Sequence, residues 1–245
     1  MRTADSCIRS RRLALLLICV LALSFNGFGL VRADSAHLFI PGIGNAVIDG
    51  YIDPTEWAAA DSYALTMTNS TMTGTLFVMQ NKTDLYLGFT IDDNEFTTGY
   101  SSGLYGDTMQ FEFDDDNSGL LYDVGENKAT IFAATPFYRD AHYINTTGSS
   151  TADTTVGGEE NGEGLSARHG DKNHFELRFP LCSGDSYDFC LSPGSIVGLR
   201  IKYYDMVPDN GGFVYSAHLY PGGELTSLVT IQLFALYSYL PLIHR

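Results

Sequence analysis

The stretch IDGYIDPTEWAAAD, residues 48–61, combines an Asp-Gly pair, an Asp-Pro pair and the only tryptophan of the chain. Apolar Ile48 followed by Asp49 and Gly50 is typical of a strand that enters a turn. Pro54 has no N–H to donate and ends the returning strand. Trp57 is followed by three alanines, whose small side chains allow close backbone approach, whereas ligand-stacking tryptophans usually have polar neighbours. We therefore predict a structural, buried role for Trp57.

Further along the chain, apolar and polar residues alternate with a period of two, and no segment after residue 33 has a helical period. The clearest strands are predicted at 84–92, 107–114, 174–180 and 195–205, and others at 75–80, 129–134, 212–219 and 228–234. Each strand has one apolar face, which only a second sheet can cover. The pattern predicts an all-β fold, an antiparallel β-sandwich. Residues 145–164 contain almost no large apolar side chains and are predicted to form a long exposed loop.

The first 33 residues have the pattern of a cleaved signal peptide. A basic segment precedes an apolar run at 13–23, and small residues follow at the expected cleavage position. The run is shorter than the roughly 20 residues of a membrane helix, so no membrane span is expected after the signal is removed. The sandwich is then assigned to residues 34–234. The apolar tail at 235–245 is either a sorting or attachment signal or the frayed end of a strand.

Charge and cysteine content restrict the function further. The chain has a net charge of −15, and removing the first 33 residues, with five basic residues and one acid, leaves −19. Such a surface repels nucleic acid and favours cations or neutral ligands. Cys182 and Cys190 are the cysteines left after the signal. In an oxidising compartment they are expected to pair, and the alternative, half of a zinc site, lacks a nearby histidine.

Five motifs occur in the order of one known family. They are IDGYIDPTEWAAAD, LYLGFTIDDNEF, YGDTMQFEFDDDNSG, HFELRFPL and IVGLRIKYYD. In this order the chain resembles the family 9 carbohydrate-binding modules and their DOMON-like relatives. The resemblance implies a jelly-roll-like sandwich with structural calcium, an aromatic-lined sugar site and no catalysis. Family members that clamp a sugar use two further tryptophans, which this chain lacks, so any stacking here must use tyrosine or phenylalanine.

The DDDNSG turn at 114–119 is the best candidate for a metal site. Asp114, Asp116 and Ser118 stand at alternate positions after a strand, and calcium requires six to eight oxygen ligands. Asp92 and Asp205 each end a strand and could contribute from other loops. The alternative is a solvated acidic turn. We predict structural calcium at these residues.

Polar side chains opposite the apolar faces are the candidates for glycan contact, because sugars are held by aromatic faces and paired hydrogen bonds. The predicted ligand-binding residues are Gln110, Glu112, Glu176, Arg178, Arg200 and Tyr204. The alternative is a solvated face with cross-strand ion pairs. Glu112 and Glu176 could also be a glycosidase pair, but two outward glutamates are common in acidic sandwiches and no catalytic motif is present.

The sequence thus predicts a secreted, non-catalytic carbohydrate-binding module, stabilised by calcium, that binds a polysaccharide or glycan and could act with a separately encoded enzyme or surface partner. One alternative is a DOMON-like haem-binding electron-transfer domain, with axial ligands among Met79, Met109, Met206, His174 and His218. Another is a cell-surface structural or adhesion module.

Overall fold

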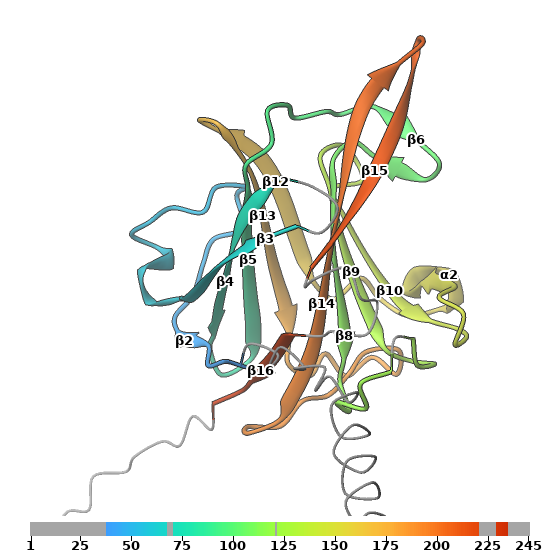
Figure 1. Cartoon of the computed structure of the whole chain (residues 1–245). Helices are drawn as coiled ribbons and strands as arrows, with labels where there is room; N and C mark the ends of the chain where they lie inside the picture. Colours follow the sequence, from blue (N-terminus) through green and yellow to red (C-terminus); the bar gives the residue numbers. More distant parts are fainter. Residues whose placement is uncertain (1–37, 68–70, 121, 221–228, 235–245) are drawn as a thin grey trace, which may run out of the picture. The chain divides into compact units, whose positions relative to one another are not determined.

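The strands of this protein follow the two-residue alternation of its sequence. The computed structural model describes residues 38–67, 71–120, 122–220 and 229–234, so the predicted signal peptide (1–33) and apolar tail (235–245) lie outside the described residues. Within these ranges the strands form two large sheets and one small hairpin (Figure 1). The hairpin consists of β6 (Tyr100–Ser101) and β7 (Leu104–Tyr105).

The first sheet contains the strands predicted near residues 107–114, 129–134, 195–205, 212–219 and 228–234. Its order in the described residues is β1-β16-β14-β8-β9-β10-β11, and β15 pairs with the C-terminal part of β14. All of these pairs are antiparallel except β1 with β16. The members are β1 (Leu38–Phe39), β8 (Thr108–Asp114), β9 (Asn127–Phe132), β10 (Tyr138–Tyr143), β11 (Ser150–Ala152), β14 (Ile196–Asp209), β15 (Gly212–Tyr220) and β16 (Val229–Gln232).

The second sheet contains the strands predicted at 75–80, 84–92 and 174–180. Its order in the described residues is β12-β13-β5-β4-β2, and β3 also pairs with β4. The β2–β4 pair is parallel and the others are antiparallel. The members are β2 (Gly42–Ile43), β3 (Asp61–Thr66), β4 (Thr73–Gln80), β5 (Asp84–Ile91), β12 (Glu163–His169) and β13 (Lys172–Pro180).

The apolar faces of the two sheets form a common core. The second sheet contributes Leu87 and Phe89 of β5 and Phe175 of β13, which are completely buried. The first sheet contributes Phe111 of β8 and Leu199 of β14, which are also completely buried. Each belongs to the apolar set that the alternation defines, because successive side chains of a strand point to opposite faces. The predicted all-β sandwich is confirmed.

Two segments differ from the expected pattern. Residues 145–164, predicted as one exposed loop, contain β11, the short helix α2 (Asp153–Val156) and the start of β12. Asp153 is completely buried, and its Oδ1 lies 2.7 Å from Nδ1 of His142. The loop prediction is wrong because these contacts are polar and leave no apolar period in the sequence.

The loop between β13 and β14 is closed by a disulfide between Cys182 and Cys190. The two cysteines also form an isolated antiparallel bridge. The bond therefore joins the two sides of a narrow loop that connects one sheet to the other. Among the described residues, no helix has both the length and the apolar character needed to cross a membrane.

Candidate functional site

The indole of Trp57 lies against the outer face of the second sheet, at the start of the 3-10 helix η2 (Trp57–Ala59). It is 3 % exposed and packs with Ile52, Met79 and Tyr86 in a cluster separate from the core between the sheets. A Cβ atom on Gly88 would come within 3.1 Å of the indole ring. Glycine at this position of β5 therefore allows the tryptophan to lie flat on the sheet.

Glu176 of β13 holds this cover in place. Its Oε1 accepts a hydrogen bond from Nε1 of Trp57 (2.9 Å). Its Oε2 accepts hydrogen bonds from the backbone N–H groups of Asp49 (3.0 Å), Gly50 (2.7 Å) and Tyr51 (3.1 Å). Burial raises the pKa of Glu176 to about 7, although these hydrogen bonds act in the opposite direction. Glu176 is 0 % exposed and offers no surface to a ligand; it anchors residues 49–57.

The six predicted glycan-contact residues lie on opposite outer faces of the sandwich. Arg178 shares the face of Glu176, where its Nη2 lies 3.1 Å from a carboxylate oxygen of Glu163. Both of these side chains are about half exposed. The remaining four project from the first sheet: Gln110 and Glu112 from β8, and Arg200 and Tyr204 from β14. The six residues therefore do not form one site.

Polar side chains from four neighbouring strands gather on the outer face of the first sheet. In the register of the sheet, Glu112 lies opposite Arg200 and Lys128. The pair formed by Gln110 and Lys202 comes two positions along. We call this surface the polar face, and its members are Gln110, Glu112, Lys128, Thr130, Arg139, Arg200, Lys202 and Tyr204.

Glu112 and Arg200 form an ion pair buried within the polar face, and each side chain is less than 5 % exposed. Lys202 reaches the other carboxylate oxygen of Glu112 at 3.3 Å. Burial alone would raise the pKa of Glu112, but the charges of Lys202 and Arg200 outweigh it and hold the pKa below its usual value. The ring of Tyr122 lies 4.6 Å from the Arg200 guanidinium carbon. The pair is thus mainly structural, and the ligand-accessible members lie beside it.

A cleft of about 340 Å³ lies on the polar face. Its floor is formed by β8, β9 and β10, and the β6–β7 hairpin, β11 and α2 contribute residues to its rim. The guanidinium carbon of Arg139 lies 5.1 Å from the centre of the Phe132 ring, which fixes the position of the charge. The polar and aromatic side chains that line it include Gln110, Lys128, Thr130, Phe132, Arg139 and Ser150.

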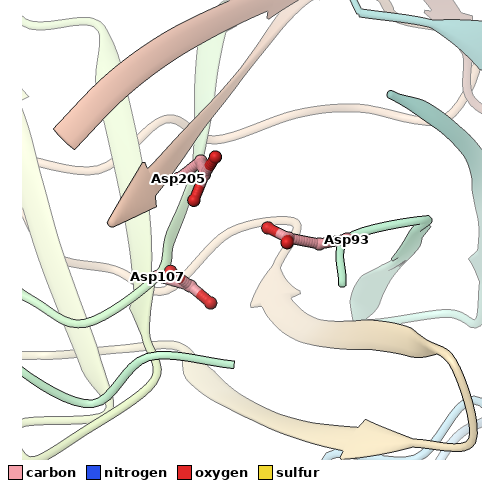
Figure 2. A group of neighbouring side chains, drawn as sticks. All are labelled: Asp93, Asp107 and Asp205. Carbon is pink, nitrogen blue, oxygen red and sulfur yellow. The ribbon is translucent and has the colours of Figure 1, made fainter. Parts of the chain in front are cut away.

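Three groups of carboxylates in the described residues are close enough to share a cation. In the first, Asp93 follows β5 of the second sheet, Asp107 precedes β8 of the first sheet, and Asp205 lies in β14. Figure 2 shows the three carboxylates around a common space. Burial raises the pKa of Asp107 to about 7, and the charges of Asp93 and Asp205 contribute. This group joins the two layers of the sandwich.

The second group consists of Asp114, Asp116 and Glu126, at the end of β8 and the start of β9. The backbone N–H of Ser118 donates to Asp114 (2.8 Å) and Asp116 (2.9 Å), and Gly119, at φ 74°, completes the turn. Oε1 of Glu126 is buried and has no hydrogen-bond partner. Burial raises the pKa of Glu126 to about 7. Ser118 shapes the loop through its backbone, while the carboxylates face one another.

The third group consists of Asp140 on β10, Asp153 in α2 and Asp188 in the disulfide loop. Each contributes one buried carboxylate oxygen without a hydrogen-bond partner, and Oδ1 of Asn161 is also buried without one. Burial raises the pKa of Asp140 to about 8, and the charges of Asp188 and Asp153 add to this. Unpartnered buried carboxylates that face one another are strongly unfavourable without a cation. Their oxygens suit a hard metal ion such as calcium.

Only some of the residues predicted to bind metal belong to these acidic groups. Asp114, Asp116 and Asp205 belong to acidic groups, whereas Asp92 forms an exposed ion pair with Lys172 and accepts a hydrogen bond from Thr73. Sequence reasoning missed Asp93, Asp107, Glu126 and the whole third group. One signal was available for Asp140: it stands at a core-facing position of β10, where a charge requires a partner.

The methionines considered for haem ligation lie in separate places. Met79 packs beneath Trp57 on the outer face of the second sheet, and Met109 lies in the core between the sheets. His174 uses Nδ1 to accept the backbone N–H of Ile52 (3.2 Å). The side chain of His218 lies outside the described residues. These positions give no support to a pair of axial ligands.

Comparison with known proteins identifies the architecture. The sequence matches no family model and no curated protein. A carbohydrate-binding module of family 9 from Caldicellulosiruptor kristjanssonii, solved in complex with cellotriose, matches 85% of this chain and 99% of its own length, at 14% identity and a TM-score of 0.58. The fold resembles that of a family 9 carbohydrate-binding module. A complex of a family 9 module from the same organism with glucose gives the same TM-score and identity over 83% of this chain and 99% of its own length. At this identity the family 9 similarity establishes the fold, and the resemblance predicted from the motif order is confirmed at that level.

Proposed function

We propose that this protein is a secreted, non-catalytic carbohydrate-binding module with structural calcium, which binds a glycan on the polar face. The observation that carries the proposal is the structural similarity, over 85% of the chain, to a family 9 module solved with cellotriose. The cleft supports the same conclusion, because its volume of about 340 Å³ and its hydrogen-bonding side chains fit a small saccharide unit.

The positions of Glu112 and Glu176 support a binding role rather than glycoside hydrolysis. A glycosidase needs two carboxyl groups about 5–10 Å apart on either side of the scissile bond. Glu112 lies on the outer face of the first sheet, and Glu176 lies on the outer face of the second, with the core between them. Both are buried and engaged in structural contacts. No single glycosidic bond reaches both.

Calcium is proposed at the acidic groups because each brings three carboxylates close enough to share one cation. The third group has the best case, since Asp140, Asp153 and Asp188 each leave an oxygen unpartnered. Such a group is stabilised when a cation replaces mutual repulsion by coordination. The side chains supply charge and oxygen ligands, and backbone carbonyls and water would complete the shell.

Composition and covalent structure support the proposed export and class of partner. The Cys182–Cys190 disulfide is typical of an oxidising compartment, which agrees with a signal peptide at residues 1–33. The net charge of −15 disfavours nucleic acid as a ligand. A module without catalytic residues would act by holding its carrier, or a separately encoded enzyme, close to a polysaccharide.

The proposal is tested by binding of the purified full chain to a glycan array and to cellotriose in about 1 mM calcium. We expect saturable binding to at least one class of polysaccharide. A Gln110→Ala variant is expected to lose this binding, while a Lys82→Ala variant, altered in the β4–β5 turn away from the polar face, keeps it. Failure of the folded, calcium-loaded protein to bind any glycan would refute the proposed function.

A further inference from the structure

Positive charge is concentrated on the polar face of a strongly acidic chain. The chain has 29 acidic and 14 basic residues. Eight lysines and arginines lie in the described residues, and four of them, Lys128, Arg139, Arg200 and Lys202, project from this one face. Glu112 pairs with two of the four, Arg200 and Lys202. The local charge at the cleft is therefore opposite in sign to that of the whole protein.

Lys128 and Arg139 are the two cations that line the cleft, and no carboxylate is among its lining residues in the described part of the chain. Neither forms an ion pair there. Nζ of Lys128 lies 3.4 Å from Oγ of Ser150, and Arg139 stacks on Phe132. Burial lowers the pKa of Lys128, with the charge of Glu112 acting against it. The cleft thus holds two positive charges that form no ion pair, although the charge of Glu112 acts on Lys128 from the neighbouring strand.

Gln110 gives a second, independent sign of a ligand. Its side chain lines the cleft and is only 5 % exposed, yet Oε1 has no hydrogen-bond partner. Buried carbonyl oxygens in folded proteins are nearly always hydrogen-bonded. A sugar hydroxyl in the cleft would donate to it. Thr130 and Ser150 supply further hydroxyl groups along the same wall.

The arrangement of the two cations suits a planar anion. Lys128 lies opposite Ala141 and Arg139 lies opposite Thr130, so the two charges are diagonal neighbours on adjacent strands β9 and β10. A guanidinium binds a carboxylate through two parallel hydrogen bonds, and an ammonium adds a point charge. A neutral sugar would cover both cations without compensating either charge, which is costly.

We propose that the cleft recognises a sugar unit that carries a carboxylate, that is, a uronic acid residue of an acidic polysaccharide. The carboxylate binds Arg139 and Lys128, and a ring hydroxyl donates to Gln110. This assignment rests on the proposed glycan-binding function and names its ligand class. Because the rest of the protein repels anions, binding should be strongest at moderate ionic strength, where screening weakens long-range repulsion more than the contacts inside the cleft.

The test compares two trisaccharides that differ only at C6: cellotriose, and cellotriose oxidised at C6 to the triuronate. Titration calorimetry with the full, calcium-loaded protein at about 0.1 M salt measures both. We expect the triuronate to bind at least tenfold more tightly. Arg139→Gln should remove this preference, because it should weaken binding of the triuronate at least tenfold more than binding of cellotriose. Lys82→Gln, which removes one positive charge outside the cleft, should change neither, and unfolding curves verify that the variants remain folded.

The outcomes separate this inference from the proposed function. Equal or tighter binding of cellotriose, or an equal loss of both ligands in Arg139→Gln, would overturn the uronate assignment while glycan binding stands. Competition by acetate as effective as that by the triuronate would show a simple anion site and also overturn it. If no trisaccharide and no arrayed glycan binds, the proposed function itself fails. Repeating the titration after free calcium is removed by dialysis excludes bridging of the triuronate to the protein surface by free metal.

Discussion

Substitution of Asp153 by asparagine should lower the free energy of unfolding in calcium but not in its absence. Asp153 belongs to one acidic group with Asp140 and Asp188, and each of the three has one buried carboxylate oxygen without a hydrogen-bond partner. In the presence of a chelator, Asp153→Asn removes one of three mutually repelling charges, and this offsets the loss of the charged contact with His142, so the free energy of unfolding should change little. In calcium, the same change removes a ligand and should lower stability. A merely structural role for Asp153 would lower stability under both conditions.

The size of the effect follows from mass action. A site with a Kd of about 10 µM is filled about a hundredfold beyond its Kd at about 1 mM calcium, which stabilises the folded state by about 2.7 kcal/mol. For a domain of this size, about 1 kcal/mol corresponds to about 2–4 °C in Tm. Calcium should therefore raise Tm by about 5–11 °C for each site filled. In Asp153→Asn the rise contributed by this one site should be absent.

The dependence on pH provides a second signature of the same site. Burial and the neighbouring carboxylates raise the pKa of Asp140 to about 8, far above its unfolded value of 3.8. The folded, metal-free protein therefore holds an extra proton between about pH 4 and 8, and the free energy of unfolding should fall as pH rises through this range. Since calcium competes with that proton, its stabilising effect should grow with pH.

Differential scanning calorimetry in calcium and in chelator, at about pH 5 and pH 8, measures the rise in Tm with calcium, its loss in Asp153→Asn and its dependence on pH. Asp171→Asn, an exposed aspartate in the β12–β13 turn, is the matched control and should behave as the unmodified protein. A calcium site at Asp153 is refuted if calcium does not change Tm at pH 8, or if Asp153→Asn lowers Tm equally in both solutions.

Three further predictions concern the cover, the disulfide and the cleft. Glu176→Leu leaves two buried donors without an acceptor, at about 1–3 kcal/mol each, and chemical denaturation should show a loss of about 2–6 kcal/mol. Joint replacement of Cys182 and Cys190 by serine opens a loop with a sequence separation of 8, which should cost about 2.5 kcal/mol, and a reducing agent should then have no further effect on the unfolding curve. Removal of calcium by a chelator should weaken glycan binding measured by calorimetry, because Asp153 and the cleft residue Thr155 belong to the same short helix. An unchanged affinity would show that the metal site does not influence the cleft.

The strands were predictable because their information is local. In β5 and β13 every second side chain is a large apolar residue, and these residues are completely buried in the core. The alternation also indicates correctly that Glu112 and Glu176 point away from the core. It does not indicate what lies outside the sheet. A glutamate that faces solvent and one that faces a covering loop occupy the same position in the alternating pattern.

The acidic groups were only partly predictable for a related reason. Asp114 and Asp116 are neighbours in sequence, so their turn could be recognised directly. Asp140, Asp153 and Asp188 come from a strand, a short helix and a disulfide loop, and their proximity is a result of the tertiary fold. No spacing in the sequence encodes such a group, although a charge on the core-facing side of β10 was a sign that a partner was required.

The buried position of Trp57 bears on the proposed recognition of a glycan. A sandwich has two outer faces, and residues 49–57 cover part of the second sheet with an indole hydrogen-bonded to Glu176. That side chain is therefore not available for stacking on a ligand. The polar face of the first sheet offers instead a cleft with two cations and an unpartnered amide oxygen. A glycan bound there, as we propose, would be recognised by charge and hydrogen bonds more than by aromatic contact. Such a site would distinguish sugars by their substituents, since an unpaired polar group inside it is costly.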